Sequence, residues 1–321
     1  GKIFASDFDL GIMGEAYYDA GSEANYGGDF SAWNNGWAYR NDNVDIQNNE
    51  DPQSNGYNVG WIESDEWMQY TLKDPTSGLY NIKVRVATED NDGSFYFKIN
   101  DNQVTDLINV PNTESWTNWS FVNIDSLVVY DTDDKFVFQV KTGTFNLGFF
   151  EFERIGDINL LQTKYISSFT LSETSININF NKNLDNTSTL NKSDSKVNMH
   201  HQEKDIQNVS YSSSPRSIII NFDTEIQPTD IVTLSYIGNS VRALDGETLI
   251  NFNNEVVENK ISFVHAIPGK IEAEHYFNQK GIELESTSDE NGGLNIGSLD
   301  NGDYADYYVK IESGDLYNVT Y

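Results

Sequence analysis

Part of this sequence occurs twice, and that repetition limits its fold more than any other feature. Residues 56–70 (GYNVGWIESDEWMQY) return as residues 293–307 (GLNIGSLDNGDYADY). A shorter pair precedes them, with KIFASDF at residues 2–8 and KIEAEHY at residues 270–276. Copies more than 200 residues apart indicate duplicated modules, because the repeats of solenoid proteins recur about every 20 to 50 residues. Duplication favours binding over catalysis, because linked weak sites gain avidity.

Composition excludes several classes of function. The 321 residues predict two or three domains, and their net charge is -30. Nucleic-acid binding needs clustered Lys and Arg, and anionic membranes repel such a chain, so we expect neither partner. No apolar run reaches the roughly 18 residues of a membrane span. The chain has no cysteine, which excludes disulfides, a thiol nucleophile and Cys-ligated zinc.

Apolar and polar residues alternate over many short stretches. These lie at residues 80–86, 95–99, 136–140, 176–180, 218–222 and 232–236. A period of two predicts strands with one buried face, and residues 100–102 (NDN) predict a hairpin turn. Polar turns rich in Asn, Asp and Gly separate the stretches. We therefore predict an all-β fold.

The pattern divides the chain into three segments. Residues 1–155 predict one β-sandwich. Residues 156–266 have the length and strand spacing of an immunoglobulin-like sandwich. Residues 267–321 repeat only the first half of the opening module, which leaves an open edge and an uncovered apolar face. We expect this third segment to be part of a longer chain and to have little stability alone.

Four short stretches of the middle segment resemble bacterial Ig-like modules. They are VTLSY at residues 232–236, ALDG at 243–246, LINF at 249–252 and VVEN at 256–259. Such modules separate catalytic and binding domains in secreted enzymes. The resemblance implies a spacer.

The opening segment resembles the carbohydrate-binding modules of family 6. The stretches that carry the match are residues 2–9 (KIFASDFD), 39–46 (YRNDNVDI), 56–67, 110–119 (VPNTESWTNW) and 145–152 (FNLGFFEF). The resemblance implies a jelly-roll β-sandwich, followed here by an Ig-like sandwich and the first half of a second jelly roll. A long aromatic loop before residues 44–46 is similar to modules on secreted enzymes that act on algal or plant polysaccharides.

The resemblance also implies a binding cleft among loops at one end of the sandwich. Two aromatic residues there hold a sugar, and an Asn binds its hydroxyls; the matching positions are Trp61, Trp116 and Asn146. Aromatic rings suit the apolar C–H face of a pyranose, and amides suit its hydroxyl rim. The alternative for each is structural: a core side chain, or an amide that satisfies a turn. We expect Trp67 and Trp119 in the core.

The first copy contains an aromatic insert. The offset between copies is 268 at Ile3 and 237 at Gly56, so the first copy has 31 extra residues between about Gly14 and Asn55. The insert holds Tyr17, Tyr18, Tyr26, Phe30, Trp33, Trp37 and Tyr39. Exposed aromatic side chains are costly without a partner, so Tyr39 and Trp37 are candidates for a wall of the cleft. Alternatively, these rings pack the loop onto the sandwich.

The second copy differs at the cleft and at the first strand. Ser298 replaces Trp61, and its side chain cannot stack on a sugar, so the second cleft is in doubt or has another ligand. The resemblance implies a structural calcium ion held by acidic residues of the first strand. Glu272 and Glu274 lie on one strand face and suit oxygen ligation.

The same two positions in the first copy are Phe4 and Ser6. A calcium ion there needs Asp7, Asp9 or Asp45 as substitute ligands.

Other motifs indicate no chemistry. His200 and His201 are adjacent, and neighbours on a strand face opposite ways, so one metal ion does not take both. Glu63, Asp65 and Glu66 offer carboxyl groups for glycoside cleavage, but they match a family loop that is not catalytic.

We therefore predict a non-catalytic protein that binds a β-linked, hydroxyl-rich polysaccharide of plant or algal cell walls, in mid-chain or at chain ends. We expect an extracellular, bacterial protein that is monomeric and holds structural calcium. We also expect it to be an accessory module of a glycoside hydrolase, tethered to the catalytic domain that it targets to the substrate. The alternatives are a jelly-roll hydrolase or lyase and a calcium-stabilised cell-surface adhesin.

Overall fold

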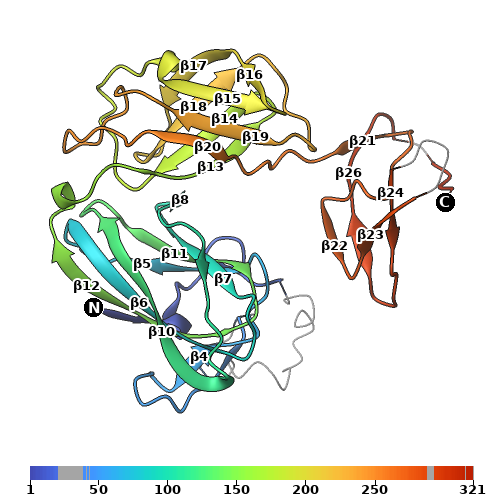
Figure 1. Ribbon diagram of the computed structural model, residues 1–321. Coiled ribbons are helices and arrows are strands. Elements are labelled where there is room, and N and C mark those ends of the chain that lie inside the picture. Colours follow the sequence, from blue (N-terminus) through green and yellow to red (C-terminus); the bar gives the residue numbers. More distant parts are fainter. Residues whose placement is uncertain (21–38, 41, 43, 288–292, 315, 321) are drawn as a thin grey trace.

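The computed structural model describes residues 1–20, 39–40, 42, 44–287, 293–314 and 316–320. This part of the chain is all-β, as predicted, and its sheets gather into three bodies (Figure 1). Its helical elements are single 3-10 turns: η1 (Ala5–Asp7), η4 (Ile158–Leu160) and η5 (Lys192–Asp194). Over the same residues, no helix combines the length and apolar character needed to cross a membrane.

Two six-stranded sheets form the first sandwich (residues 1–156). One has the order β10 (Ser115–Val129), β6 (Gly78–Thr88), β12 (Asn146–Gly156), β4 (Tyr57–Val59), β3 (Ile46–Asn48), with β1 (Lys2–Phe4) also on β12. The other has the order β2 (Tyr17–Tyr18), β5 (Trp67–Thr71), β11 (Lys135–Thr142), β7 (Ser94–Ile99), β8 (Asn102–Gln103), with β9 (Ile108–Asn109) also on β7. All these pairings are antiparallel.

Phenylalanine rings fill the space between the two sheets. Phe97 and Phe136 have ring centroids 4.6 Å apart, and Phe138 and Phe150 have centroids 5.5 Å apart. All four side chains are fully buried. Alternate residues of each strand reach this core, which confirms the period-two prediction.

Tight turns follow from residues in left-handed backbone conformations. Asn100 and Asp101 join β7 to β8 with φ of 47° and 68°, as the predicted two-residue hairpin requires. His200 and His201 have φ of 49° and 66° and form the same kind of turn between β15 (Ser195–Met199) and β16 (Gln202–Lys204). The expectation that these histidines lie on a strand was therefore wrong.

The middle sandwich (residues 165–256) has a separate core. Its first sheet is β13 (Tyr165–Ser172), β14 (Ser175–Phe180), β18 (Ser217–Phe222), β17 (Ile206–Tyr211), and its second is β16 (Gln202–Lys204), β15 (Ser195–Met199), β19 (Val232–Tyr236), β20 (Phe252–Val256). Apolar side chains from both sheets, such as Ile178, Ile220 and Leu234, form one buried cluster. Its Ig-like class and the exact domain limits stay predictions.

The C-terminal segment (residues 264–320) contains three two-stranded sheets. They are β21 (Val264–Ile267) with β26 (Tyr308–Ile311), β22 (Asn278–Lys280) with β25 (Tyr304–Asp306), and β23 (Glu283–Ser286) with β24 (Leu294–Gly297). Leu294, Val309 and Ile311 are exposed, as the half-module prediction requires.

Hydrogen bonds of the first sandwich recur in the C-terminal segment. Tyr70 donates its hydroxyl hydrogen to the carbonyl oxygen of Ala5 at 2.9 Å. Tyr307 donates to the carbonyl oxygen of Ala273 at 2.7 Å. The sequence repeat pairs these residues with each other, so the repeat is also a structural one.

The backbone of the repeat is conserved where it is least usual. Trp61 has a φ of 47°, and Ser298, its counterpart, has a φ of 56°. Asp65 has a φ of 67°, and its counterpart Gly302 has a φ of 104°. The loop therefore keeps its course although the side chain at its tip changes from an indole to a hydroxymethyl group.

Strand register locates the insert of the first copy. Tyr17 on β2 and Gln279 on β22 occupy equivalent positions and differ by 262 in number. Gln47 on β3 and Glu285 on β23 are also equivalent and differ by 238. Most of the extra residues therefore lie between β2 and β3, in a stretch that includes residues 21–38, which lie outside the described residues.

Candidate functional site

The predicted binding residues lie at one end of the first sandwich. β6 pairs antiparallel with both β10 and β12, so β6 ends where these two strands begin. Trp116 is the second residue of β10, and Asn146 is the first residue of β12. Trp61 follows β4, whose end pairs with the start of β12. The strand arrangement therefore brings these three residues to the same end.

Asn146 connects the two tryptophan segments. Its side chain is only 5% exposed, and its Nδ2 donates to the carbonyl oxygen of Trp116 at 2.8 Å. A Cβ atom on Gly60 would stand 2.9 Å from Asn146 Oδ1 and 3.2 Å from Gln47 Nε2. The amides of Asn146 and Gln47 therefore both lie against Gly60, next to Trp61.

Gln47 was not predicted from the sequence. Its signal was its position two residues after Asp45, since alternate residues of a strand share a face.

The two tryptophans are outside the core. Trp61 is 44% exposed and Trp116 is 37% exposed, and neither belongs to the buried cluster. The positive φ of Trp61 is uncommon for a bulky residue and costs backbone energy. Such strain is typical of positions that present a side chain for binding. Neither residue is therefore a core side chain, and sugar binding by both stays a prediction.

Two other tryptophans were placed wrongly. Trp67 was expected in the core, but its neighbours Met68 and Tyr70 take the inward positions on β5, at 2% exposure each. Trp67 lies on the outer face of the sheet, in a recess that it shares with Lys98. Trp119 was also expected in the core, yet it is partly buried against the outer side of Gly148.

Tyr39 contacts the first 3-10 turn instead of the tryptophans. Its ring packs on Tyr57, with centroids 4.4 Å apart, and its hydroxyl donates to Asp7 Oδ1. Arg40 stacks over the ring of Phe8, with its guanidinium carbon 3.5 Å from the ring centroid. These contacts hold the end of the insert on the sandwich, as the packing alternative requires. Trp37, the other candidate, lies outside the described residues.

The candidate calcium ligands at the first strand of the first sandwich make other contacts. Phe4 packs on Phe149, and Ser6 Oγ accepts a hydrogen bond from Asn55 at 3.0 Å. Asp7 is occupied by Tyr39. Among the described residues, no group of three or more His, Asp or Glu side chains is arranged to hold a metal ion.

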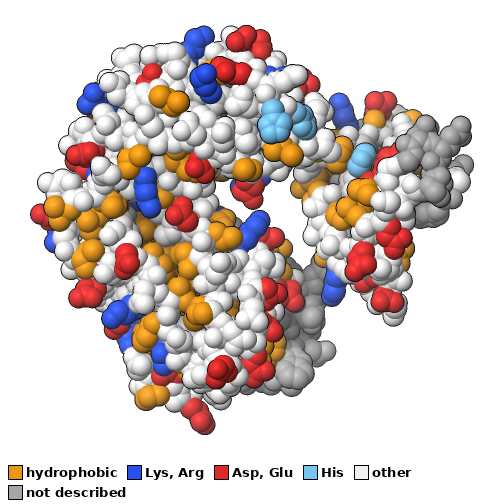
Figure 2. All heavy atoms as spheres, viewed as in Figure 1, with side chains coloured by type: hydrophobic (Ala, Val, Ile, Leu, Met, Phe, Trp, Pro, Cys, Tyr) orange, Lys and Arg blue, Asp and Glu red, His pale blue; other side chains and the backbone are white. Residues whose placement is uncertain are grey.

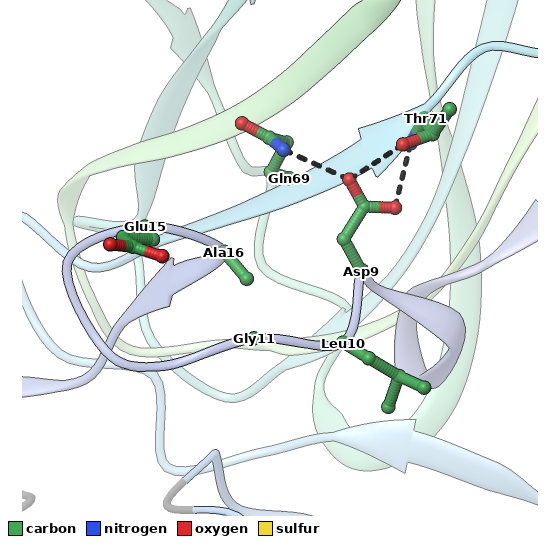
Figure 3. Close-up of a pocket in the computed structure, with 7 residues that line it drawn as sticks. All are labelled: Asp9, Leu10, Gly11, Glu15, Ala16, Gln69 and Thr71. Atoms are coloured by element: carbon green, nitrogen blue, oxygen red, sulfur yellow. Dashed lines mark hydrogen bonds between the residues drawn. The ribbon is translucent and has the colours of Figure 1, made fainter.

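Asp9 has a structural role. Its carboxylate accepts hydrogen bonds from Gln69 Nε2 at 2.9 Å, from Thr71 N at 2.8 Å and from Thr71 Oγ1 at 2.9 Å (Figure 3). These bonds close one side of a recess of about 350 Å³ at the edge of β5. Asp9 therefore fixes the chain after η1 to β5.

The C-terminal pair is also engaged elsewhere. Glu272 Oε1 lies 2.6 Å from Lys270 Nζ in an ion pair, and burial together with the charge of Glu274 raises the pKa of Tyr307. Calcium binding through Glu272, Glu274, Asp7 and Asp45 stays a prediction.

Acidic residues lie in and next to the loop that carries Trp61: Asp45 accepts a hydrogen bond from Gly60 N through its carbonyl oxygen at 2.9 Å, and Glu63 and Glu66 follow Trp61 in the chain. Burial, and then the charge of Glu63, raise the pKa of Asp45 to about 6. Burial, and then the charge of Asp19, raise the pKa of Glu66 to about 9. Glu66 Oε1 accepts a hydrogen bond from Ala20 N at 3.2 Å. Glu66 is therefore protonated and uncharged at neutral pH, and the negative charge here comes from Asp45 and Glu63, which disfavours anionic ligands.

A comparison with protein-family models now identifies the two copies. The model for the carbohydrate binding module (family 6) matches residues 38–154 and residues 272–321, which together exceed half of the chain. The chain belongs to carbohydrate-binding module family 6. Family 6 modules are non-catalytic jelly-roll sandwiches, so the predicted family and fold class are confirmed.

Solved structures of family 6 modules resemble the chain at low sequence identity. The C-terminal module of LamC, a marine laminarinase from Zobellia galactanivorans, is 22% identical, with a TM-score of 0.35, over 48% of this chain and 98% of that one. A β-1,3-glucan-binding module from Bacillus halodurans is 18% identical, with a TM-score of 0.35, over 48% and 95%.

A module of the Cellvibrio mixtus lichenase 5A, solved with cellotriose, is 24% identical, with a TM-score of 0.32, over 35% and 87%. The search of curated proteins returned no match.

Gly60→Ala is expected to weaken carbohydrate binding by the family 6 module while the fold survives. The new Cβ would push the flexible amides of Asn146 and Gln47 out of place, and losing one well-placed hydrogen bond costs about 1 kcal/mol, or roughly fivefold to tenfold in affinity. Affinity electrophoresis and thermal melting measure the two effects. Gly314→Ala, where no atom lies near the added Cβ, is the control. Unchanged affinity would contradict the site.

Glu66→Gln is expected to stabilise the protein at high pH. Because the pKa of Glu66 is raised from its ordinary 4.5 to about 9, the folded state binds a proton that the unfolded state releases. The stabilisation from that proton is complete below about pH 4.5 and is lost as the pH rises towards about 9. Chemical denaturation should show the variant and the native protein equal at pH 4, with the variant more stable at pH 9.

The exposed Glu89→Gln is the matched control. An equal difference between the Glu66 variant and the native protein at both pH values would show that Glu66 is not a buried acid.

Proposed function

We propose that the cleft of Trp61, Trp116 and Asn146 binds a hydroxyl-rich, β-linked polysaccharide of plant or algal cell walls. The proposal includes targeting: the module holds an attached secreted glycoside hydrolase on its substrate. One observation carries the binding proposal. Two exposed indole side chains flank a buried carboxamide that the fold holds in place through a hydrogen bond to the backbone of one of them.

This arrangement has the chemistry of a sugar site. The C–H face of a pyranose ring removes apolar surface from water when it lies on an indole. Asn146 keeps its Oδ1 on the side of Gly60, and Gln47 adds a second amide there. Amides both donate and accept hydrogen bonds, as sugar hydroxyls do. The site therefore offers indole rings to the apolar face of a neutral sugar and amide groups to its hydroxyls.

Charge narrows the class of ligand. The chain has a net charge of -30, and Asp45 and Glu63 lie beside Trp61. On the face shown in Figure 2, acidic side chains are widespread, and the Lys and Arg side chains are scattered and form no large basic patch. Sulfated and uronate polymers are therefore expected to bind poorly.

A site of this size implies modest affinity. A disaccharide of about 23 non-hydrogen atoms, at about -0.3 kcal/mol per atom, gives roughly -7 kcal/mol. That free energy corresponds to a dissociation constant on the order of 10 µM. Tethering to an enzyme or to further modules raises the effective affinity without new contacts.

The proposal applies to the first sandwich only. In the C-terminal segment, Ser298 stands where Trp61 does, and its Oγ donates to Glu283 Oε2 at 2.9 Å. That position has no aromatic surface to offer a sugar ring. We expect this copy to have a different ligand or none at this cleft.

Trp61→Ala and Trp116→Ala are each expected to lower polysaccharide affinity by about thirtyfold or more, since truncating a central aromatic contact typically costs about 2 kcal/mol or more. The melting temperature should change little, because both side chains are exposed. Isothermal titration calorimetry and thermal melting provide the two measurements.

Trp119→Ala is the matched control, because Trp119 lies on β10 three residues after Trp116 and is partly buried against Gly148. Equal loss of affinity in all three variants, or unfolding of the Trp61 or Trp116 variant, would show that the cleft is misplaced.

A panel of polymers separates binding from catalysis. Affinity electrophoresis is run against laminarin, xylan, agarose, mixed-linkage β-glucan, mannan, alginate and carrageenan, and the same mixtures are assayed for new reducing ends. Retardation by neutral polymers without new reducing ends supports the proposal. New reducing ends would establish a hydrolase or lyase, and the absence of both signals would favour an adhesin.

A further inference from the structure

A buried ion pair joins the first sandwich to the middle sandwich. Arg216 precedes β18, and its Nη2 lies 2.6 Å from Asp133 Oδ2 of the first sandwich. Its Nη1 donates to the carbonyl oxygen of Val128 at 3.1 Å, and its Nε donates to Asn183 Oδ1 at 3.1 Å. The side chains of Arg216 and Asp133 are each only 1% exposed. Arg216 is therefore enclosed by residues of both units.

The surroundings of the pair also come from both units. The ring of Tyr130 lies under the guanidinium, 5.2 Å from its central carbon, and the Tyr130 hydroxyl accepts a hydrogen bond from Asn183 N at 3.1 Å. Ser214, two residues before Arg216, donates to Asn102 Oδ1 on β8. Neither sandwich alone supplies this set of partners.

A buried ion pair of this kind affects the orientation of the two sandwiches more than their stability. Removing two charges from water costs nearly as much as their attraction returns, so a buried ion pair adds little net stability. Arg216 nevertheless keeps its charge at any ordinary pH, and its planar group requires acceptors in fixed directions. An altered angle between the sandwiches would leave that buried charge without its partners. The pair therefore selects one orientation of the two units.

A second, surface contact also joins the two sandwiches. Lys141 on β11 lies 3.6 Å from Glu258, which follows β20 in the chain. Asp133 comes just before the start of β11 and Lys141 near its end, so about 20 Å of strand separates the two contacts, at 3.4 Å per residue or so. Both side chains of this second pair are about half exposed, so it adds little energy and the buried Arg216 contact is the main constraint on the orientation.

The connection between the units is short. β12 ends at Gly156 and β13 begins at Tyr165. Between them, Thr163 is fully buried, and its carbonyl oxygen accepts a hydrogen bond from Ile250 N at 2.9 Å. Little free chain therefore remains to let the sandwiches move apart.

The Arg216 contact lies at the end of β10 opposite the cleft. β10 runs from Trp116, at the cleft, to Val128, whose carbonyl oxygen accepts from Arg216. Figure 1 shows the middle sandwich next to the end of the first sandwich that carries β8, as the bond from Ser214 to Asn102 requires. Docking therefore leaves Trp61 and Trp116 accessible.

We propose that the first and middle sandwiches form one rigid unit, fixed by Arg216 and Asp133, in which Trp61 and Trp116 stay exposed. The middle sandwich then holds the first sandwich in a fixed orientation and is not a flexible spacer. A polysaccharide held at the cleft would have a set direction relative to whatever the middle sandwich carries. This proposal does not depend on which ligand the cleft binds.

Distance measurements between spin labels test the proposal directly. The chain has no cysteine, so Asp125→Cys on the first sandwich and Glu203→Cys on the middle sandwich, both exposed, take labels only where intended. Double electron–electron resonance should give one narrow distance distribution in the otherwise native chain. A broad distribution there would overturn the proposal, whatever any variant does.

Variants then test the residues that fix the orientation. Arg216→Ala is expected to lose the single narrow peak, and Arg242→Ala, an exposed arginine of the same sandwich, should keep it. Asp133→Ala approaches the contact from the first sandwich, so it decides the question if Arg216→Ala fails to fold. A narrow peak retained in whichever of the Arg216 and Asp133 variants fold would show that the ion pair does not fix the orientation.

Discussion

The packing of phenylalanine rings between two twisted sheets is the interaction on which the first sandwich depends. Phe97, Phe136, Phe138 and Phe150 exclude water from the centre, and strand alternation then sends the intervening residues outward. The strand ends are thereby free to carry exposed side chains. At one end they carry two indoles and an amide, and at the other end they receive an arginine from the next unit.

Asn146 shows how the core positions the site. The next residue, Leu147, is fully buried and pairs with Val59 on β4, so the backbone at Asn146 has little freedom. Its amide then bonds the Trp116 backbone and lies against Gly60. The preorganised amide costs no ordering when a ligand binds, which is the main way a small site gains affinity.

The period-two patterns predicted the all-β class and residues 100–102 predicted the hairpin, because these depend on local sequence. The resemblance to family 6 modules predicted the family and the positions of Trp61 and Trp116 outside the core. Trp67 was misplaced because β5 has large apolar or aromatic side chains on both faces, and composition cannot choose between them. Arg216 was not predicted, since its partners come from residues far away in the chain. Gln47 was missed although it lies two residues after Asp45, because its approach to Gly60 depends on the pairing of β3 with β4.

The most direct test of carbohydrate binding at Trp61, Trp116 and Asn146 is a nuclear magnetic resonance titration of the isotope-labelled protein. It follows the side-chain N–H resonances of the six tryptophans and of Asn146. A β-linked glucan oligosaccharide is added in steps while the spectra are recorded. The account predicts saturable shifts at the indoles of Trp61 and Trp116 and at the Asn146 amide, with Trp119 unchanged. Shifts confined to other tryptophans, with those three resonances unmoved by any neutral β-linked glycan, would contradict it.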